Sequence, residues 1–250
     1  MVELPKLMLG TSPFIGAGQF GHRAYEYRRR FFRQPENMTT LFVKSAEFGV
    51  AAVQLVAYEP LVRALERAFE VRGEKFFVAA VITSGVKFDK HLRLIERLEP
   101  EVVAMHAAFC DIADKRLWEW AKKIREAGAA PAASTHVPGE TIPMLDASGL
   151  DIEAYLAPLN PKGLFMEPDY ESSLRAIKQT DKKVIAIKPL AAGALKPEKS
   201  LFEFIFEHAD SVSVGITSER EMRETYTAAF AALGERNIDD RTKANRLRPR

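Results

Sequence analysis

The chain has 250 residues, 47% of them hydrophobic, and its 36 Lys+Arg nearly balance its 34 Asp+Glu. Because the charges nearly cancel, this is not a strongly basic protein of the kind that binds nucleic acid or anionic lipid through its net charge. Its single cysteine, Cys110, excludes an internal disulfide. Because the sequence shows neither an apolar signal core at its amino terminus nor a run long enough to span a membrane, we expect a cytoplasmic protein without nucleic-acid or membrane partners.

Eight short apolar runs alternate with longer amphipathic segments along the chain. The runs span residues 7–9, 51–56, 76–82, 102–106, 130–133, 152–159, 184–187 and 212–214. Continuous apolar runs of this length are typical of parallel strands that are covered on both faces. The run 130–133 has poor strand propensity, so its assignment depends on its place in the alternation.

Three of the intervening segments show clear helix signals. Residues 61–73 and 114–128 are amphipathic and end at a glycine, and Ser218 begins another helix as an N-cap with Glu221 as its capping-box partner. Eight strand–helix alternations over this length predict a single (β/α)8 barrel, the TIM-barrel architecture of the α/β class, and one domain over residues 1–250.

Two segments depart from this alternation. Residues 16–37 are too long for an ordinary strand–helix loop, so they form either a lid over the barrel mouth or an insert that packs against its side. The last residues, about 238–250, have the composition of a frayed tail.

Polar residues follow most of the apolar runs, at the strand ends where parallel barrels hold their active sites. In chain order they are Thr11 and Ser12, Gln54 and Tyr58, Thr83 and Ser84, His106, Ser134 to His136, Asn160, Lys188, and Gly215 with Thr217. Their convergence on one rim predicts a site for a small-molecule substrate. It also favours a functional His106 over a core histidine that only satisfies backbone groups.

Several of these polar residues leave alternatives open. His136 belongs either to the site or to the cap of the next helix. Lys188 is either a buried amine suited to Schiff-base chemistry or a rim cation that binds an anion, and we favour the second. A metal site of His106, Cys110 and His136 lacks an HxH or HExxH signature and is not expected. The run of arginines at 28–30 is interpreted as a solvated charge run rather than a phosphate site.

Seven segments, in the right order, resemble the aldo-keto reductase family. They read KLMLGTSPFIGAGQFG, KSAEFGVAAVQLVAYEP, PEVVAMHA, PAASTHVPGE, APLNP, VIAIKPLAAGAL and SVSVGITSEREMRE. The most specific is VIAIKPLAAGAL, which resembles the family's KPL-small-G-x-L stretch. The resemblance covers nearly the whole chain and implies a TIM barrel that reduces carbonyl compounds with NADPH or NADH.

The family's catalytic residues are an aspartate, a tyrosine, a lysine and a histidine, and this chain keeps them in part. His106 matches the histidine, which orients the carbonyl. Tyr58, the candidate proton donor, lies one residue nearer to Gln54 than the family spacing gives. Gln54 stands at the aspartate position, and apolar Val81 and Ile82 stand at the lysine position. A tyrosine without a cationic neighbour keeps a pKa near its reference value of about 10, which is poorly suited to acid–base work at neutral pH.

The positions that bind the cofactor in this family match the sequence better than the catalytic positions do. It assigns binding of the dinucleotide to Ser134, Asn160, Lys188, Pro189, Leu190, Gly193, Gly215 and Ser218. Glu221 falls near the adenosine end, where its charge would repel a 2′-phosphate, so the implied cofactor is either NADP or NAD.

These observations predict a divergent aldo-keto-reductase-like oxidoreductase that binds a nicotinamide dinucleotide and reduces a small carbonyl. Tyr25 or Tyr27 of the long first loop could replace Tyr58 as the proton donor. Two alternatives stay open: a lyase, isomerase or hydrolase that uses Lys188, His106 and His136, and a catalytically inactive, ligand-binding homologue.

Overall fold

The computed structural model describes residues 1–85 and 87–234, and the predicted tail at 238–250 lies outside them. Eight parallel strands close into a barrel in sequence order, with β1 paired to β8. The strands are β1 (Leu7–Gly10), β2 (Ala52–Val56), β3 (Phe77–Ile82), β4 (Val102–Met105), β5 (Ala130–Ser134), β6 (Ala154–Pro158), β7 (Lys183–Ile187) and β8 (Ser211–Gly215). The predicted (β/α)8 barrel is confirmed, including its weakest strand, β5.

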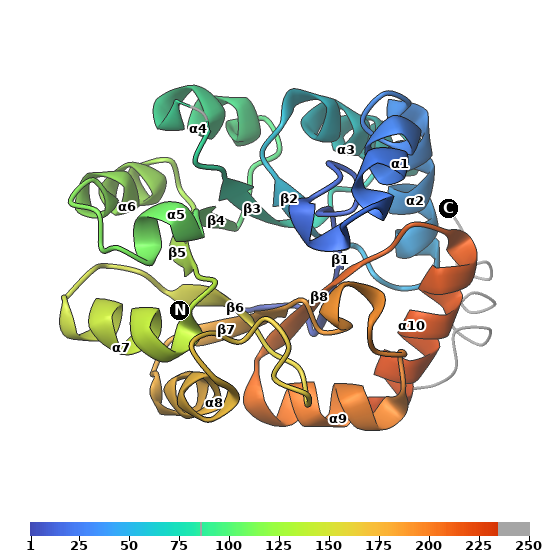
Figure 1. The fold of residues 1–250 in the computed structure, drawn as a ribbon. Coiled ribbons are helices and arrows are strands. Elements are labelled where there is room, and N and C mark those ends of the chain that lie inside the picture. Colours follow the sequence, from blue (N-terminus) through green and yellow to red (C-terminus); the bar gives the residue numbers. More distant parts are fainter. Residues whose placement is uncertain (86, 235–250) are drawn as a thin grey trace.

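Helices form a ring outside the strands, as Figure 1 shows. They are α1 (Arg23–Arg30), α2 (Pro35–Glu47), α3 (Glu59–Arg72), α4 (Phe88–Glu96), α5 (Ala107–Cys110), α6 (Leu117–Glu126), α7 (Pro138–Ala147), α8 (Tyr170–Gln179), α9 (Lys199–His208) and α10 (Glu219–Ala232). None of the helices in the described ranges is long and apolar enough to cross a membrane.

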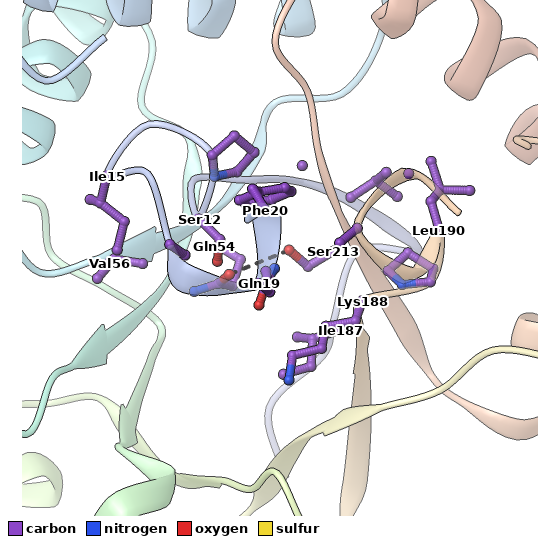
Figure 2. A pocket seen from close by; sticks show the side chains of 18 of the residues that line it. Ser12, Ile15, Gln19, Phe20, Gln54, Val56, Ile187, Lys188, Leu190 and Ser213 are labelled. Carbon is purple, nitrogen blue, oxygen red and sulfur yellow. Dashed lines mark hydrogen bonds between the residues drawn. The ribbon is translucent and has the colours of Figure 1, made fainter. Parts of the chain in front are cut away.

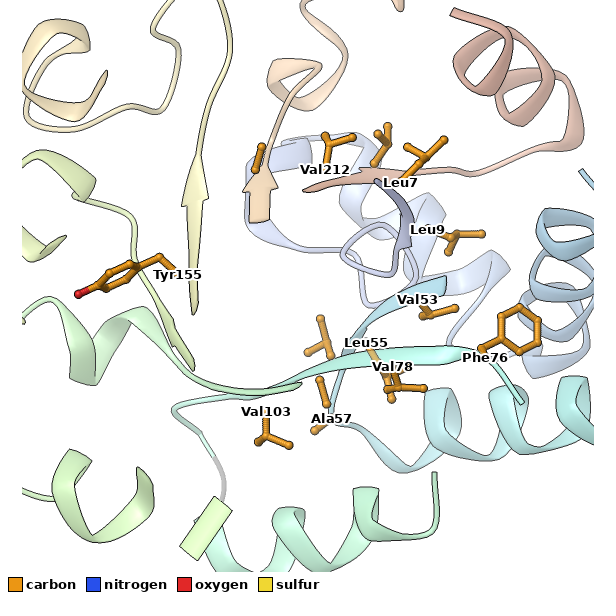
Figure 3. Packing of buried hydrophobic residues seen from close by; sticks show 14 of the residues in the cluster. Leu7, Leu9, Val53, Leu55, Ala57, Phe76, Val78, Val103, Tyr155 and Val212 are labelled. Atoms are coloured by element: carbon orange, nitrogen blue, oxygen red, sulfur yellow. The ribbon is translucent and has the colours of Figure 1, made fainter. Parts of the chain in front are cut away.

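Strand residues alternate between two apolar clusters because successive side chains point to opposite faces of a strand. The larger cluster lies between the strands and the helices, where Figure 3 shows Val53, Val78 and Val103 among the packed side chains. The smaller cluster fills the barrel interior with Met8, Val102 and many alanines. The same alternation decides which residues beyond each strand end face the interior.

The helix ends follow local sequence signals. Gly73 ends α3 in the left-handed conformation, with φ of 72°, and Gly128 follows α6 with φ of 87°. Ser218 caps α10 by accepting a hydrogen bond from the Glu221 backbone N–H at 3.2 Å. A capping box also predicts a bond from the Ser218 backbone N–H to the Glu221 carboxylate. Instead, this carboxylate accepts from the backbone N–H and the hydroxyl of Thr217, at 2.8 and 2.6 Å.

The long first loop covers the barrel mouth. It contains a 3-10 helix, Gly18–Phe20, and helix α1, and Gln19, Phe20 and Tyr27 line the cavity described below. Its far end is anchored by the buried ring of Phe31, which packs 4.6 Å from the ring of Phe14, centroid to centroid. The segment is therefore both a cover and a packed insert.

Candidate active site

A cavity of about 580 Å³ opens at the carboxyl ends of the strands. Its floor includes Val81 and Leu156, which also belong to the interior cluster of the barrel. Figure 2 shows the first loop on one side of the cavity and the segment after β7, with Lys188 and Leu190, on the other. The cavity thus lies where the strand-end residues were predicted to converge.

Most of the predicted site residues line this cavity. They are Gln54, His106, Ser134, Lys188, Pro189, Leu190, Gly193 and Gly215. His136 lines it as well. The strand pattern explains the placement of Gln54 and Ser134, which share the inward face of their strands with alanines of the interior cluster.

His106 follows β4 directly and caps the short helix α5. Its Nδ1 accepts a hydrogen bond from the backbone N–H of Ala108 at 3.1 Å. Burial lowers the pKa of His106, and the nearby charge of Asp111 opposes this only in part. An uncharged ring whose Nδ1 is an acceptor carries its proton on Nε2. His106 therefore offers the cavity one N–H donor.

His136 stands beside His106, with ring centroids 5.8 Å apart in an edge-to-face arrangement. Burial lowers the pKa of His136 to about 4, helped by the positive charge of Lys188. The ring is therefore uncharged at neutral pH. No hydrogen bond joins its ring nitrogens to another residue in the described ranges, so both nitrogens are open to a ligand.

Asp111 fixes the loop that carries His136. Its Oδ1 accepts from the hydroxyls of Thr135 at 2.6 Å and Thr141 at 2.8 Å, and its Oδ2 accepts from the His136 backbone N–H at 3.2 Å. The sequence analysis missed this residue. The available signal was its position at the other end of the short helix α5, which His106 begins as the N-cap and Asp111 ends as the C-cap.

Lys188 lines the cavity from the end of β7. Its backbone has a φ of 55°, in the left-handed region that favours glycine. Its ammonium lies 5.2 Å from the centroid of the Phe165 ring. Burial lowers the pKa of Lys188, and the charges of Asp111 and Glu167 oppose this in part.

Gln54 occupies the position where the resembled family has an aspartate. Its side chain is buried, and its Oε1 accepts from the hydroxyl of Ser213 at 3.5 Å, as Figure 2 shows. Val81, at the expected lysine position, lines the same cavity with an apolar side chain. The structure thus brings neither a carboxylate nor a cation to these two positions.

Three predicted residues do not line the cavity. Tyr58 packs its ring 6.1 Å from that of Phe32, and its hydroxyl accepts from Thr83 at 3.4 Å. Asn160 uses its amide on its own loop, donating to the Leu164 carbonyl at 2.7 Å. Ser218 caps α10. The predicted roles of these residues stay predictions.

Arg23 is a lining residue that the sequence analysis did not select. Its Nη2 donates to the carbonyl of Ala192 at 2.5 Å, which ties the first loop to the segment after β7. A Cβ at Gly193 would lie 3.0 Å from this guanidinium. No carboxylate lies within ion-pair distance of Arg23 in the described part of the chain. In contrast, the arginines at 28–30 are exposed.

Cys110 lies apart from the two histidines. Its buried thiol donates to the Met105 carbonyl at 3.4 Å, and burial raises its pKa. Across residues 1–85 and 87–234, no group of three or more His, Cys, Asp or Glu side chains is arranged to hold a metal ion.

Comparison with known proteins relates the chain to others through structure. No protein-family model matches the sequence, and no curated protein matches it. An aldo-keto reductase from Pseudomonas aeruginosa is similar with 16% identity and a TM-score of 0.66, over 92% of this chain and 91% of that one. A thermostable aldo-keto reductase solved with the inhibitor epalrestat has 14% identity and a TM-score of 0.65, over 96% and 94%.

A barrel of another kind has a lower TM-score than these two structures. A tryptophan synthase structure from M. tuberculosis has 12% identity and a TM-score of 0.53, over 80% of this chain and 87% of that one. The chain therefore shares its fold, a closed (β/α)8 barrel, with these aldo-keto reductase structures.

Proposed function

We propose that this protein binds a nicotinamide dinucleotide and reduces a small carbonyl compound beside His106. The observation that carries the proposal is one continuous cavity. It holds the uncharged His106 and His136 at the ends of β4 and β5, and it extends along the segment after β7 to Glu221 and Glu224 of α10. Its volume of about 580 Å³ lies in the range of ordinary ligand and cofactor sites. The similarity to aldo-keto reductase structures supports the fold side of the proposal.

The lining residues fit a dinucleotide. Glycines at 10, 193 and 215 line the cavity, and the space that a Cβ would take at each is filled by Ser213, Arg23 and Pro13 respectively, so these glycines fit the walls of the cavity together. Arg23 supplies a cation that no carboxylate of the described residues neutralises, and it would hold a phosphate. Ser134 places a hydroxyl on the cavity wall for the carboxamide end. When bound, the dinucleotide would supply the hydride.

The carboxylates at the far end of the cavity favour NAD over NADP. Glu221 and Glu224 both line this end. Two carboxylates repel a 2′-phosphate, and they accept hydrogen bonds from an unmodified ribose diol. The proposed cofactor is therefore NADH.

The roles of the chain's own groups follow from their placement. The His106 Nε2–H donates to the carbonyl oxygen of the substrate and orients it. Among Tyr25, Tyr27 and Tyr58, only Tyr27 lines the cavity, so we assign the proton donor to its hydroxyl. Gln54, hydrogen-bonded to Ser213, lines the cavity with an uncharged amide where the resembled family has an aspartate.

A cofactor titration tests the first part of this proposal. Purified protein is titrated with NADH and with NADPH while nicotinamide fluorescence is followed. We expect saturable binding that is at least about tenfold tighter for NADH, a difference of about 1.4 kcal/mol. Arg23→Met should weaken NADH binding by at least about tenfold, whereas the matched control Arg29→Met, on the exposed face of α1, should not. Absence of binding by the wild-type protein at millimolar cofactor contradicts the proposal.

A carbonyl screen with bound NADH tests the second part. His106→Ala should lower kcat by about 100-fold or more, and Tyr27→Phe should lower it by a similar factor. Tyr25→Phe, on the exposed face of α1, serves as the matched control. Full turnover by the Tyr27→Phe variant would show that Tyr27 is not the proton donor. The rest of the proposal would be unaffected.

A further inference from the structure

Lys188 lies where the strand pattern alone would not place it. Ile185 and Ile187 of β7 face the barrel interior, so alternation would send the next side chain outward toward the helices. Instead, Lys188 takes a left-handed backbone with φ of 55°, and its side chain lines the cavity. A left-handed residue other than glycine costs about 1–2 kcal/mol. An outlier of this kind points to a functional demand on the side chain.

The amine of Lys188 faces few groups that would hold its proton. Burial lowers its pKa, and the two carboxylates that oppose this, Asp111 and Glu167, act through space rather than through a hydrogen bond. Its Nζ lies over the Phe165 ring, 5.2 Å from the ring centroid. The other titratable neighbour is the uncharged ring of His136.

We propose that Lys188 is a nucleophilic amine that forms an imine with small aldehydes and ketones. This activity goes beyond the proposed reduction, because it needs no dinucleotide. The Nζ lone pair attacks the carbonyl carbon, a C–N bond forms, and the C–O bond then breaks. The two hydrogens that leave Nζ depart with the oxygen as water, so nothing is oxidised or reduced.

The two histidines that line the same cavity serve the proton transfers of this step. The uncharged His136 ring accepts a proton from Nζ as the C–N bond forms. The His106 Nε2–H donates to the carbonyl oxygen, which becomes the leaving water. A nucleophile, a base and a donor therefore border one cavity.

The test traps the imine without any dinucleotide. The full chain is incubated at pH 7.5 with propanal, and separately with pyruvate, in the presence of sodium cyanoborohydride, which reduces an imine to a stable secondary amine. Trypsin does not cleave before proline, so one peptide, residues 184–199, contains both Lys188 and the exposed Lys196 as an internal control. Fragmentation of this peptide gives the labelling rate at each lysine.

We expect Lys188 to be labelled at least about tenfold faster than Lys196 with one of the two probes, because a lower pKa leaves more of the amine uncharged. His136→Gln should slow labelling at Lys188 by about tenfold and leave Lys196 unchanged. Equal or slower labelling at Lys188 in the wild-type protein with both probes overturns the proposal. This readout does not depend on cofactor binding, so it is distinguishable from a failure of the proposed reductase activity.

Discussion

His136 links the chemistry of the cavity to the stability of the fold. Burial holds its pKa at about 4, below the ordinary histidine value of 6.5. Between these two pH values the unfolded chain binds a proton that the folded chain does not, so the free energy of unfolding falls as the pH is lowered from about 6.5 to about 4. Because the ring is partly exposed, we expect this group to account for about 1–2 kcal/mol of that fall.

Urea unfolding at a series of pH values measures this effect. In the His136→Gln variant, the fall in the free energy of unfolding should be smaller by about 1–2 kcal/mol. His106, whose pKa burial also lowers, still contributes to the fall in the same direction. His22→Gln, a change at an exposed residue before α1, is the matched control for the loss of a histidine. An unchanged slope in His136→Gln would show that the ring binds its proton equally in the folded and the unfolded chain, which contradicts a lowered pKa.

Asp111 is the residue on which the geometry of His136 depends. Its Oδ1 accepts from the buried hydroxyls of Thr135 and Thr141. Asp111→Ala leaves both hydroxyls and the His136 N–H without this acceptor and should cost about 2–4 kcal/mol. Asp111→Asn keeps an oxygen for the two hydroxyls and should cost only about 1 kcal/mol. Equal losses in urea unfolding would show that these hydrogen bonds do not carry the effect.

The segment after β7 has an unusual backbone. Ala191 and Ala192 have φ of 45° and 55°, and Gly193 follows with φ of 92°. Since a methyl group disfavours this region, Ala192→Gly should raise the free energy of unfolding by about 0.5–1 kcal/mol. Ala194→Gly, where φ is −76°, should lower it by a similar amount. Urea unfolding of the pair checks both signs, and the same sign for both would contradict a strained Ala192.

The sequence predicts site residues at strand ends better than site residues in loops. Gln54, His106 and Ser134 could be placed because each continues the inward-facing alternation of a strand. Asn160 could not, because beyond β6 the chain turns through hydrogen bonds that its own amide makes with the loop. Arg23 was missed because the sequence predicts one long loop over residues 16–37, whereas the structure places Arg23 at the start of helix α1.

The barrel closes where its first strand, β1, pairs with its last strand, β8. The register pairs Gly10 of β1 with Gly215 of β8, near the carboxyl ends of both strands. A Cβ at Gly10 would lie 2.6 Å from the Ser213 hydroxyl and 3.2 Å from the backbone of Val214. The closing seam therefore has no room for a side chain at position 10.

Gly10→Ala should cost about 2 kcal/mol through this overpacking and lower the Tm by about 4–8 °C for a chain of this size. Gly18→Ala, where a Cβ meets nothing within 4 Å, is the matched control and should change the Tm by less than about 1 °C. Trp118 and Trp120 lie on α6, across the barrel from the seam (Figure 1). If closure stabilises the barrel as one unit, tryptophan fluorescence and far-ultraviolet circular dichroism should report the same lowered midpoint. A fluorescence midpoint that stays at the wild-type value would instead confine the damage to the seam.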